Sequence, residues 1–209
     1  MPFPRIAIAA TIGWLTMAAA GAATAPSSAE TVEGNDNRRP AGILGDGALT
    51  VRIYAARGDW RPERDEGPAL NVTAFGEEGG SLVTPGPLLR VPEGAEVIVH
   101  VRNTLAERLT IHGFVTRPAA EDAIFTVQPG QTREIRFAAG VPGTYHYWAA
   151  ASGHAFGERT DVDSQLSGAL VVDPPGVQPD DRIMVIGLWV KPGTIGNAGD
   201  NIGTINGTS

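Results

Sequence analysis

The sequence predicts an all-β sandwich or barrel. The chain of 209 residues contains 27 Gly and 16 Pro, which interrupt the long apolar periodicities that helices need. From about Ala48 onward, short apolar runs rich in β-branched residues alternate with Gly and Pro turns. In the clearest run Val97, Val99 and Val101 alternate with polar residues, as on a strand with one buried face.

Each predicted strand is bounded by turn residues, among them Pro92-Glu93-Gly94, Pro129-Gly130 and Pro142-Gly143. The predicted strands are, in chain order, Leu49–Ala55, Ala69–Phe75, Leu88–Val91, Glu96–Asn103, Leu109–Phe114, Thr132–Ala138, Gly143–Ala149, Ala169–Asp173 and Arg182–Leu188. The strands up to Asp173 are enough for one buried core, so residues 47–176 are predicted to form a single domain.

The N-terminal residues 1–25 are predicted to be a signal peptide. Arg5 gives a positive start, Ile6–Ala20 is apolar, and Ala18–Ala22 offers small residues for cleavage. The apolar stretch is short of the roughly 20 residues of a membrane span, although an uncleaved anchor is the alternative. The sequence thus predicts a periplasmic or secreted protein without a stable membrane span. Residues 26–46, rich in polar residues, Gly and Pro, are predicted to be a disordered leader.

Charge and cysteine content exclude two classes of function. The chain carries 16 basic and 23 acidic residues, a net charge of -7, and no basic run. A nucleic-acid partner is therefore not expected, because phosphate binding needs clustered Lys and Arg. Cysteine is absent, which excludes disulfides and a blue copper site, since that site needs a Cys thiolate.

The C-terminal residues 177–209 are predicted to be a strand and a linker. The last residues, Gly203–Ser209, have the pattern of a strand that enters a turn. We expect this region to lead into a second domain of a longer protein. A frayed natural terminus is the alternative.

Several motifs in order make the chain between Leu49 and Pro175 resemble a known family. The motifs are Ala74–Gly80 followed by Pro85–Gly94, then Glu96–Leu105, then Leu109–Gly113, and finally Gly143–Trp148 followed by Asp163–Val172. Their order and spacing resemble the N-terminal cupredoxin domain of the multicopper oxidases, the laccase-like enzymes.

The resemblance implies a Greek-key β-sandwich and a copper cofactor. Enzymes of this family oxidise a substrate at a blue copper in a later domain and reduce dioxygen at a trinuclear copper cluster. The cluster lies between the first and last cupredoxin domains, and the first domain supplies two His-x-His pairs to it. The implied partners are a second cupredoxin domain or a neighbouring subunit, with a small-molecule or metal-ion reductant as substrate.

The residues at the ligand positions depart from this pattern. Residues i and i+2 of a strand share one face about 7 Å apart, so a His-x-His pair can address neighbouring metal ions. In this sequence the first pair falls on Thr110 and His112, and the second on Trp148 and Ala150. Only His112 keeps an imidazole, which copper accepts well as a ligand.

Other side chains are candidates to complete a copper site. His146 lies two residues before Trp148 and is expected on the same strand face, while His154 lies in the following loop. Asp161 and Asp163 in that loop offer oxygen ligands, which copper favours less than nitrogen. His112, His146 and His154 are therefore the predicted metal ligands, although His146 as a packed strand residue and His154 as an ordinary loop residue are the structural alternatives.

Three functions follow as hypotheses. The first is the N-terminal domain of an exported multicopper-oxidase-family protein whose catalytic copper ligands lie mostly in a C-terminal domain, so that this chain alone is inactive. The second is a non-catalytic cupredoxin-like binding or structural module, because fold alone does not fix function. The third is a small copper carrier, which the absence of Cys and the presence of only 3 Met make the weakest.

Overall fold

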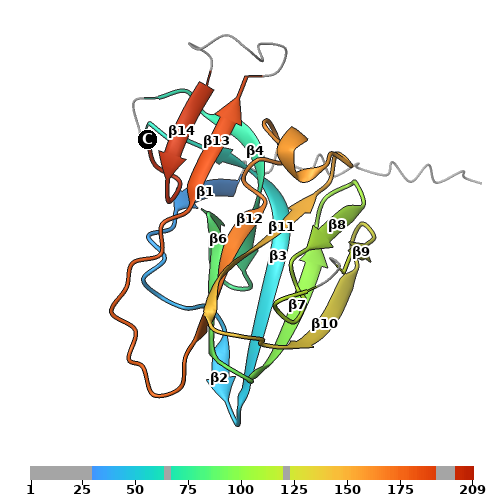
Figure 1. Ribbon diagram of the computed structural model, residues 1–209. Coiled ribbons are helices and arrows are strands. Elements are labelled where there is room, and N and C mark those ends of the chain that lie inside the picture. The colour runs from blue at the N-terminus through green and yellow to red at the C-terminus, as the bar shows by residue number, and fades with distance from the viewer. Residues whose placement is uncertain (1–29, 64–66, 120–122, 192–200) are drawn as a thin grey trace, which may run out of the picture.

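The computed structural model describes residues 30–63, 67–119, 123–191 and 201–209 and confirms the all-β fold (Figure 1). The predicted signal peptide, residues 1–25, lies outside the described residues. The described chain contains two facing β-sheets, a two-stranded hairpin and one short 3-10 turn. No helix in these ranges is long and apolar enough to cross a membrane.

The first sheet has seven strands and a mixed topology. Along the sheet the order is β1-β5-β4-β3-β7-β10, with β2 paired to β3 and a second pairing between β1 and β3. The strands are β1 (Glu30–Gly34), β2 (Ile43–Gly45), β3 (Ala48–Trp60), β4 (Leu70–Glu77), β5 (Leu82–Thr84), β7 (Glu96–Asn103) and β10 (Thr132–Ala138).

The second sheet has five strands in the order β6-β12-β11-β8-β9. The strands are β6 (Gly86–Pro92), β8 (Leu109–His112), β9 (Phe125–Val127), β11 (Gly143–Ala150) and β12 (Ser167–Asp173). The 3-10 turn η2 (Phe156–Glu158) follows β11 in the loop that leads to β12. Strand β11 is central, because it pairs with β12 over its first part and with β8 over its last residues.

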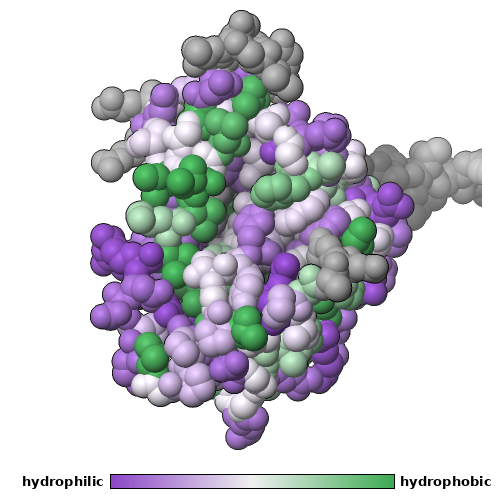
Figure 2. All heavy atoms as spheres, in the orientation of Figure 1, coloured by the Kyte–Doolittle hydropathy of each residue, from purple (hydrophilic) through white to green (hydrophobic). Residues whose placement is uncertain are grey.

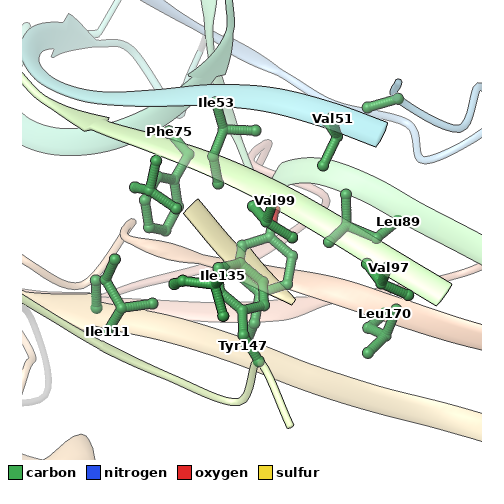
Figure 3. Packing of buried hydrophobic residues seen from close by; sticks show 14 of the residues in the cluster. Val51, Ile53, Phe75, Leu89, Val97, Val99, Ile111, Ile135, Tyr147 and Leu170 are labelled. Carbon is green, nitrogen blue, oxygen red and sulfur yellow. The ribbon is translucent and has the colours of Figure 1, made fainter. Parts of the chain in front are cut away.

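The core lies between the two sheets and follows the predicted alternation. Val97, Val99 and Val101 of β7 are completely buried, and in Figure 3 Val97 and Val99 face side chains from the second sheet such as Leu170 and Tyr147. The Tyr147 hydroxyl is buried too, and it donates a 2.6 Å hydrogen bond to the carbonyl oxygen of Pro87. A buried hydroxyl needs such a partner, so this bond ties β11 to β6 across the sheet.

The prediction of a disordered leader over residues 26–46 is wrong for its described part. Residues 30–34 form β1, which pairs in parallel with both β3 and β5, and residues 43–45 form β2. Val32 is 4% exposed and packs with Trp60 and Leu82. A strand that buries a single apolar residue has no visible apolar run, so composition alone pointed to disorder. The domain therefore begins before residue 47.

The C-terminal residues form a hairpin that contacts the domain. Strands β13 (Ile186–Val190) and β14 (Asn201–Ile205) pair antiparallel. The segment before them is anchored by Ile183, which is buried against Leu88. The strand predicted at 182–188 corresponds to β13, which lies a few residues further toward the C-terminus. The strand pattern noted in Gly203–Ser209 corresponds to β14.

The outward face of this hairpin is apolar. Figure 2 shows hydrophobic side chains gathered over β13 and β14 and the segment that leads into them. Met184, Ile186, Leu188 and Ile205 are between 50% and 82% exposed. Ile186 and Ile205 are direct cross-strand partners, so they form one continuous patch.

Candidate metal centre

The predicted ligand positions lie together on the outer face of the second sheet. Trp148 of β11 is the cross-strand partner of His112 of β8, and Ala150 is the partner of Thr110. Directly opposite residues have Cβ atoms about 5 Å apart, and residues two apart on a strand lie about 7 Å apart. The four side chains therefore occupy the corners of a compact rectangle, which we call the β8–β11 face. Ile111 and Ala149, which alternate with them, point into the core.

Trp148 and His112 are in direct ring contact. Their ring centroids lie 3.8 Å apart and the ring planes are parallel to within 3°. Both residues are half-buried, whereas Ala150 is 2% exposed. The position opposite His112 is therefore filled by an indole that lies flat on the imidazole.

A glycine immediately after His112 brings β8 close to β11. Gly113 has φ +88, a conformation that residues with a side chain rarely adopt. A Cβ atom at this position would lie 2.4 Å from the carbonyl oxygen of His146. Only glycine allows this approach, so Gly113 helps to place His112 beside β11.

A surface hollow of about 500 Å³ opens over the β8–β11 face. All four corner residues line it, together with Arg108 and residues of the loop after β11, including His154 and Phe156. His154 is exposed, and its backbone N–H donates to the Ser152 hydroxyl. The hollow therefore contains two of the predicted ligands, His112 and His154.

His146 lines a neighbouring hollow of about 310 Å³ with Arg117, Tyr145, Trp148 and Phe156. Its ring meets the Phe156 ring edge to face at 5.1 Å. Burial, reinforced by the positive charges of Arg159 and Arg117, lowers the pKa of His146 to about 4. The imidazole is therefore neutral at physiological pH, and Trp148 and Phe156 lie at the border of both hollows.

The loop after β11 is held by a buried arginine. Arg159 is 6% exposed, and its Nη1 donates to the carbonyl oxygens of Ala149, Asp163 and Leu166. Its guanidinium carbon lies 4.7 Å from the Trp148 ring centroid and 5.3 Å from that of Phe156, which is cation–π range. Burial lowers the Arg159 pKa to about 10, so the group remains a cation.

Asp163 supports the same loop from the other side. The carboxylate is completely buried and accepts hydrogen bonds from the Thr73 hydroxyl and from the backbone N–H groups of Ala151 and Ser152, at 2.7 to 2.9 Å. Its oxygens are thus engaged in the fold, which makes Asp163 a structural residue rather than an oxygen ligand.

The predicted ligands are only partly brought together. His112 and His154 line one hollow, and His146 lines the next. Within the described ranges, no group of three or more His, Asp or Glu side chains is arranged to hold a metal ion. That these three histidines bind a metal ion therefore stays a prediction.

The sequence did not point to Phe156, Arg159 or Arg108 as neighbours of these positions. Phe156 and Arg159 come from a loop with no strand or helix periodicity, so their contact with Trp148 depends on the loop's path. The sequence offers one signal for Arg159. It lies close to Asp161 and Asp163 in the same loop, a spacing that suggests a buried contact between opposite charges.

Part of the chain matches a known protein family. Residues 81–176 match the family described as multicopper oxidase. This range includes β6 to β12 and therefore the whole β8–β11 face.

Known proteins with similar sequences are much longer than this chain. The multicopper oxidase MmcO of Mycobacterium tuberculosis is 33% identical over 88 residues, which cover 40% of this chain and 16% of MmcO. A probable nitrite reductase-hydroxylamine oxidoreductase fusion protein of Kuenenia stuttgartiensis is 28% identical over 150 residues, which cover 65% of this chain and 16% of that protein. The chain thus spans about a sixth of either curated relative.

Solved structures agree on the fold. A crystal structure of a multicopper oxidase superposes with a TM-score of 0.58 and 25% identity, over 83% of this chain and 59% of that one.

Proposed function

Since this chain carries a cupredoxin domain of the multicopper oxidase family, we propose that it is the first domain of a longer, exported, copper-dependent oxidoreductase. In this proposal the longer protein oxidises a small-molecule or metal-ion reductant and reduces dioxygen. The chain alone is inactive, and its β8–β11 face meets the copper ligands of a second cupredoxin domain or a neighbouring subunit.

The observation that carries the proposal is the position of His112. The sequence resemblance implies a ligand at this position, and the residue is half-buried in a hollow of about 500 Å³ that is open at the surface. His154 lines the same hollow, and His146 lines the neighbouring hollow, which Trp148 and Phe156 also line. Imidazole is a ligand that suits copper, so this face provides one nitrogen ligand, His112, with two further histidines nearby.

The residues of the face do not fit a trinuclear copper cluster by themselves. Thr110, Trp148 and Ala150 stand at the other three positions, and neither an indole nor a methyl group is a copper ligand. Copper, when bound, supplies one-electron redox chemistry, and most of its ligands would have to come from outside this domain. The role of the chain's own residues is to place His112: Gly113 sets its backbone and Trp148 sets the plane of its ring.

Export is the second part of the proposal. It is supported by the sequence of residues 1–25, with Arg5 ahead of the apolar stretch Ile6–Ala20 and small residues after it.

A non-catalytic module is the second candidate function. It is favoured by the Trp148 ring, which lies against His112 at 3.8 Å at a position where the sequence resemblance implies a ligand. In that case the domain keeps the fold and serves as a binding or structural unit.

The test uses the full-length protein after copper loading. Copper per chain is measured by elemental analysis, and oxygen consumption is measured with a phenol and with a metal-ion reductant, in wild type and His112→Ala. The matched control is His100→Ala, because His100 is also half-buried but lies on β7, near Glu134 of the first sheet. Loss of copper and oxygen uptake in His112→Ala alone is expected. Less than one copper per chain in the wild type would exclude the oxidoreductase, and oxygen uptake that depends on His112 would exclude the non-catalytic module.

A further inference from the structure

We propose that Trp148 takes the place of a copper ligand on the β8–β11 face, so that this domain keeps the backbone of a metal site but cannot hold copper by itself. The proposal deepens the proposed function and rests on it for the location of the face. It concerns what the side chains of this chain do there, which the family match leaves open.

The backbone at the face has the geometry that several ligands need. Strands β8 and β11 pair without a register shift from His112 to Thr110, so Trp148 and Ala150 stand directly opposite them. Cross-strand Cβ atoms are about 5 Å apart, close enough for two imidazoles at such positions to bind one metal ion. The scaffold is therefore present, and only the side chains depart from a ligand set.

The ring contact leaves no space for a metal ion between the two rings. An imidazole binds a metal through a nitrogen lone pair that lies in the plane of the ring. Trp148 and His112 instead meet face to face, parallel to within 3° and at 3.8 Å, which is van der Waals contact. The indole nitrogen is a donor only, so Trp148 fills the space of a ligand and offers no lone pair.

Neighbouring residues hold the indole in this position. Phe156 packs against Trp148 at 5.4 Å between ring centroids, and the buried Arg159 lies 4.7 Å from the indole ring. Arg159 is itself fixed by hydrogen bonds to Ala149, Asp163 and Leu166. Rotation of Trp148 away from His112 would break these contacts, so the ring is a fixed part of the face.

Charge acts in the same direction. Arg108 lines the hollow above the face, and Arg159 lies beneath the aromatic rings. The described lining of this hollow contains no carboxylate. The lining therefore presents a positive charge and no carboxylate ligand to a divalent cation.

The experiment uses the 209-residue chain and Cu(II) as the only probe. Copper binding is measured by competition with a chelator and by electron paramagnetic resonance, in wild type, Thr110→His, Trp148→Ala and Thr110→His/Trp148→His. Thr110→His is the matched control that adds a ligand but keeps the indole, and Trp148→Ala removes the indole but adds no ligand. Thr110 and Trp148 are both half-buried. Far-UV circular dichroism checks that each variant is folded.

The double variant is expected to bind one copper per chain with nitrogen hyperfine structure, at least about tenfold more tightly than either single variant. Adding His112→Ala to it is expected to abolish this site. The proposal is overturned if Thr110→His alone binds copper as tightly as the folded double variant, if the folded double variant binds none, or if the wild type binds copper in a way that His112→Ala abolishes. These readings are independent of oxygen uptake by the full-length protein, so failure of the proposed function is seen separately.

Discussion

The indole N–H of Trp60 donates a 3.0 Å hydrogen bond to the carbonyl oxygen of Gly207 and so joins the end of β3 to the C-terminal turn. Trp60 is 1% exposed, which makes this a buried bond. Gly207 has φ +80, and a Cβ atom there would lie 2.1 Å from the carbonyl oxygen of Thr84. The C-terminal turn therefore packs against the domain, and only glycine fits at position 207.

Replacing Trp60 by Phe is expected to lower the free energy of unfolding by about 2 kcal/mol. The substitution leaves the Gly207 carbonyl without its donor and leaves a small cavity beside Val32 and Leu82. Urea unfolding measures the change. Trp189→Phe is the control, because Trp189 is half-buried at the edge of the same cluster and should lose less. Equal losses in the two variants would contradict the role given to the bond.

Replacing Asp163 by Asn is expected to destabilise the protein by about 3 kcal/mol. The carboxylate is completely buried, accepts three hydrogen bonds and lies near Arg159, so its loss leaves a buried cation less compensated. Thermal or urea unfolding provides the measurement. Asp180→Asn, at an exposed position, should change stability by less than about 0.5 kcal/mol. A similarly small effect at Asp163 would show that the loop does not depend on it.

The metal-free protein is expected to lose stability as pH falls from about 6.5 to about 4. The pKa of His146 is lowered from 6.5 to about 4 in the folded state, so between these values the unfolded chain binds a proton that the folded chain does not. Stability is thus complete above the unfolded pKa and declines below it, by about 1 to 3 kcal/mol after allowance for solvent screening. Unfolding is measured at several pH values with a chelator present. His146→Gln should flatten this part of the profile, and an unchanged slope would rule out His146 as its source.

Replacing Gly113 by Ala is expected to destabilise the protein by more than about 2 kcal/mol and to disturb the ring contact of His112 with Trp148. The new Cβ atom would lie 2.4 Å from the His146 carbonyl oxygen in a conformation that already disfavours alanine. Unfolding measures the first effect and near-UV circular dichroism the second. Gly153→Ala is the matched control, since Gly153 has φ +81 but open space around it. If both variants behave alike, the close approach of β8 and β11 is not what Gly113 provides.

Much of the fold follows from the sequence because its main strands have clear alternation. The pattern of β7 and β10 predicts their bounds correctly, since Val97, Val99 and Val101 stand on one face and turns flank both strands. Strands β5 and β9 were not predicted, because three residues are too few to show a period. β1 was missed for a related reason: Val32 is its one buried residue, and its neighbours are polar.

The sequence predicts which residues form the site, but it does not predict how their side chains contact one another. The sequence places Thr110 and His112 on one predicted strand and Trp148 on another, with Ala150 directly after its predicted end, and the observed register makes them neighbours. The flat contact between His112 and Trp148 depends on that register and on the packing of Phe156 from a loop. Loop paths carry no periodic signal, which is why the contributions of Phe156 and Arg159 emerge only from the structure.

The parallel pairing of β1 has a consequence for the order in which the protein is made. β1 leaves the ribosome before all other described strands, yet both of its partners, the end of β3 and β5, lie later in the chain, as far as residue 84. Parallel neighbours cannot be joined by a tight turn, so β1 has nothing to pair with until those segments have formed. The earliest described strand therefore cannot join the sheet until residues 58–60 and 82–84 have been made, and residues 30–34 stay open to chaperones, proteases or export factors until then.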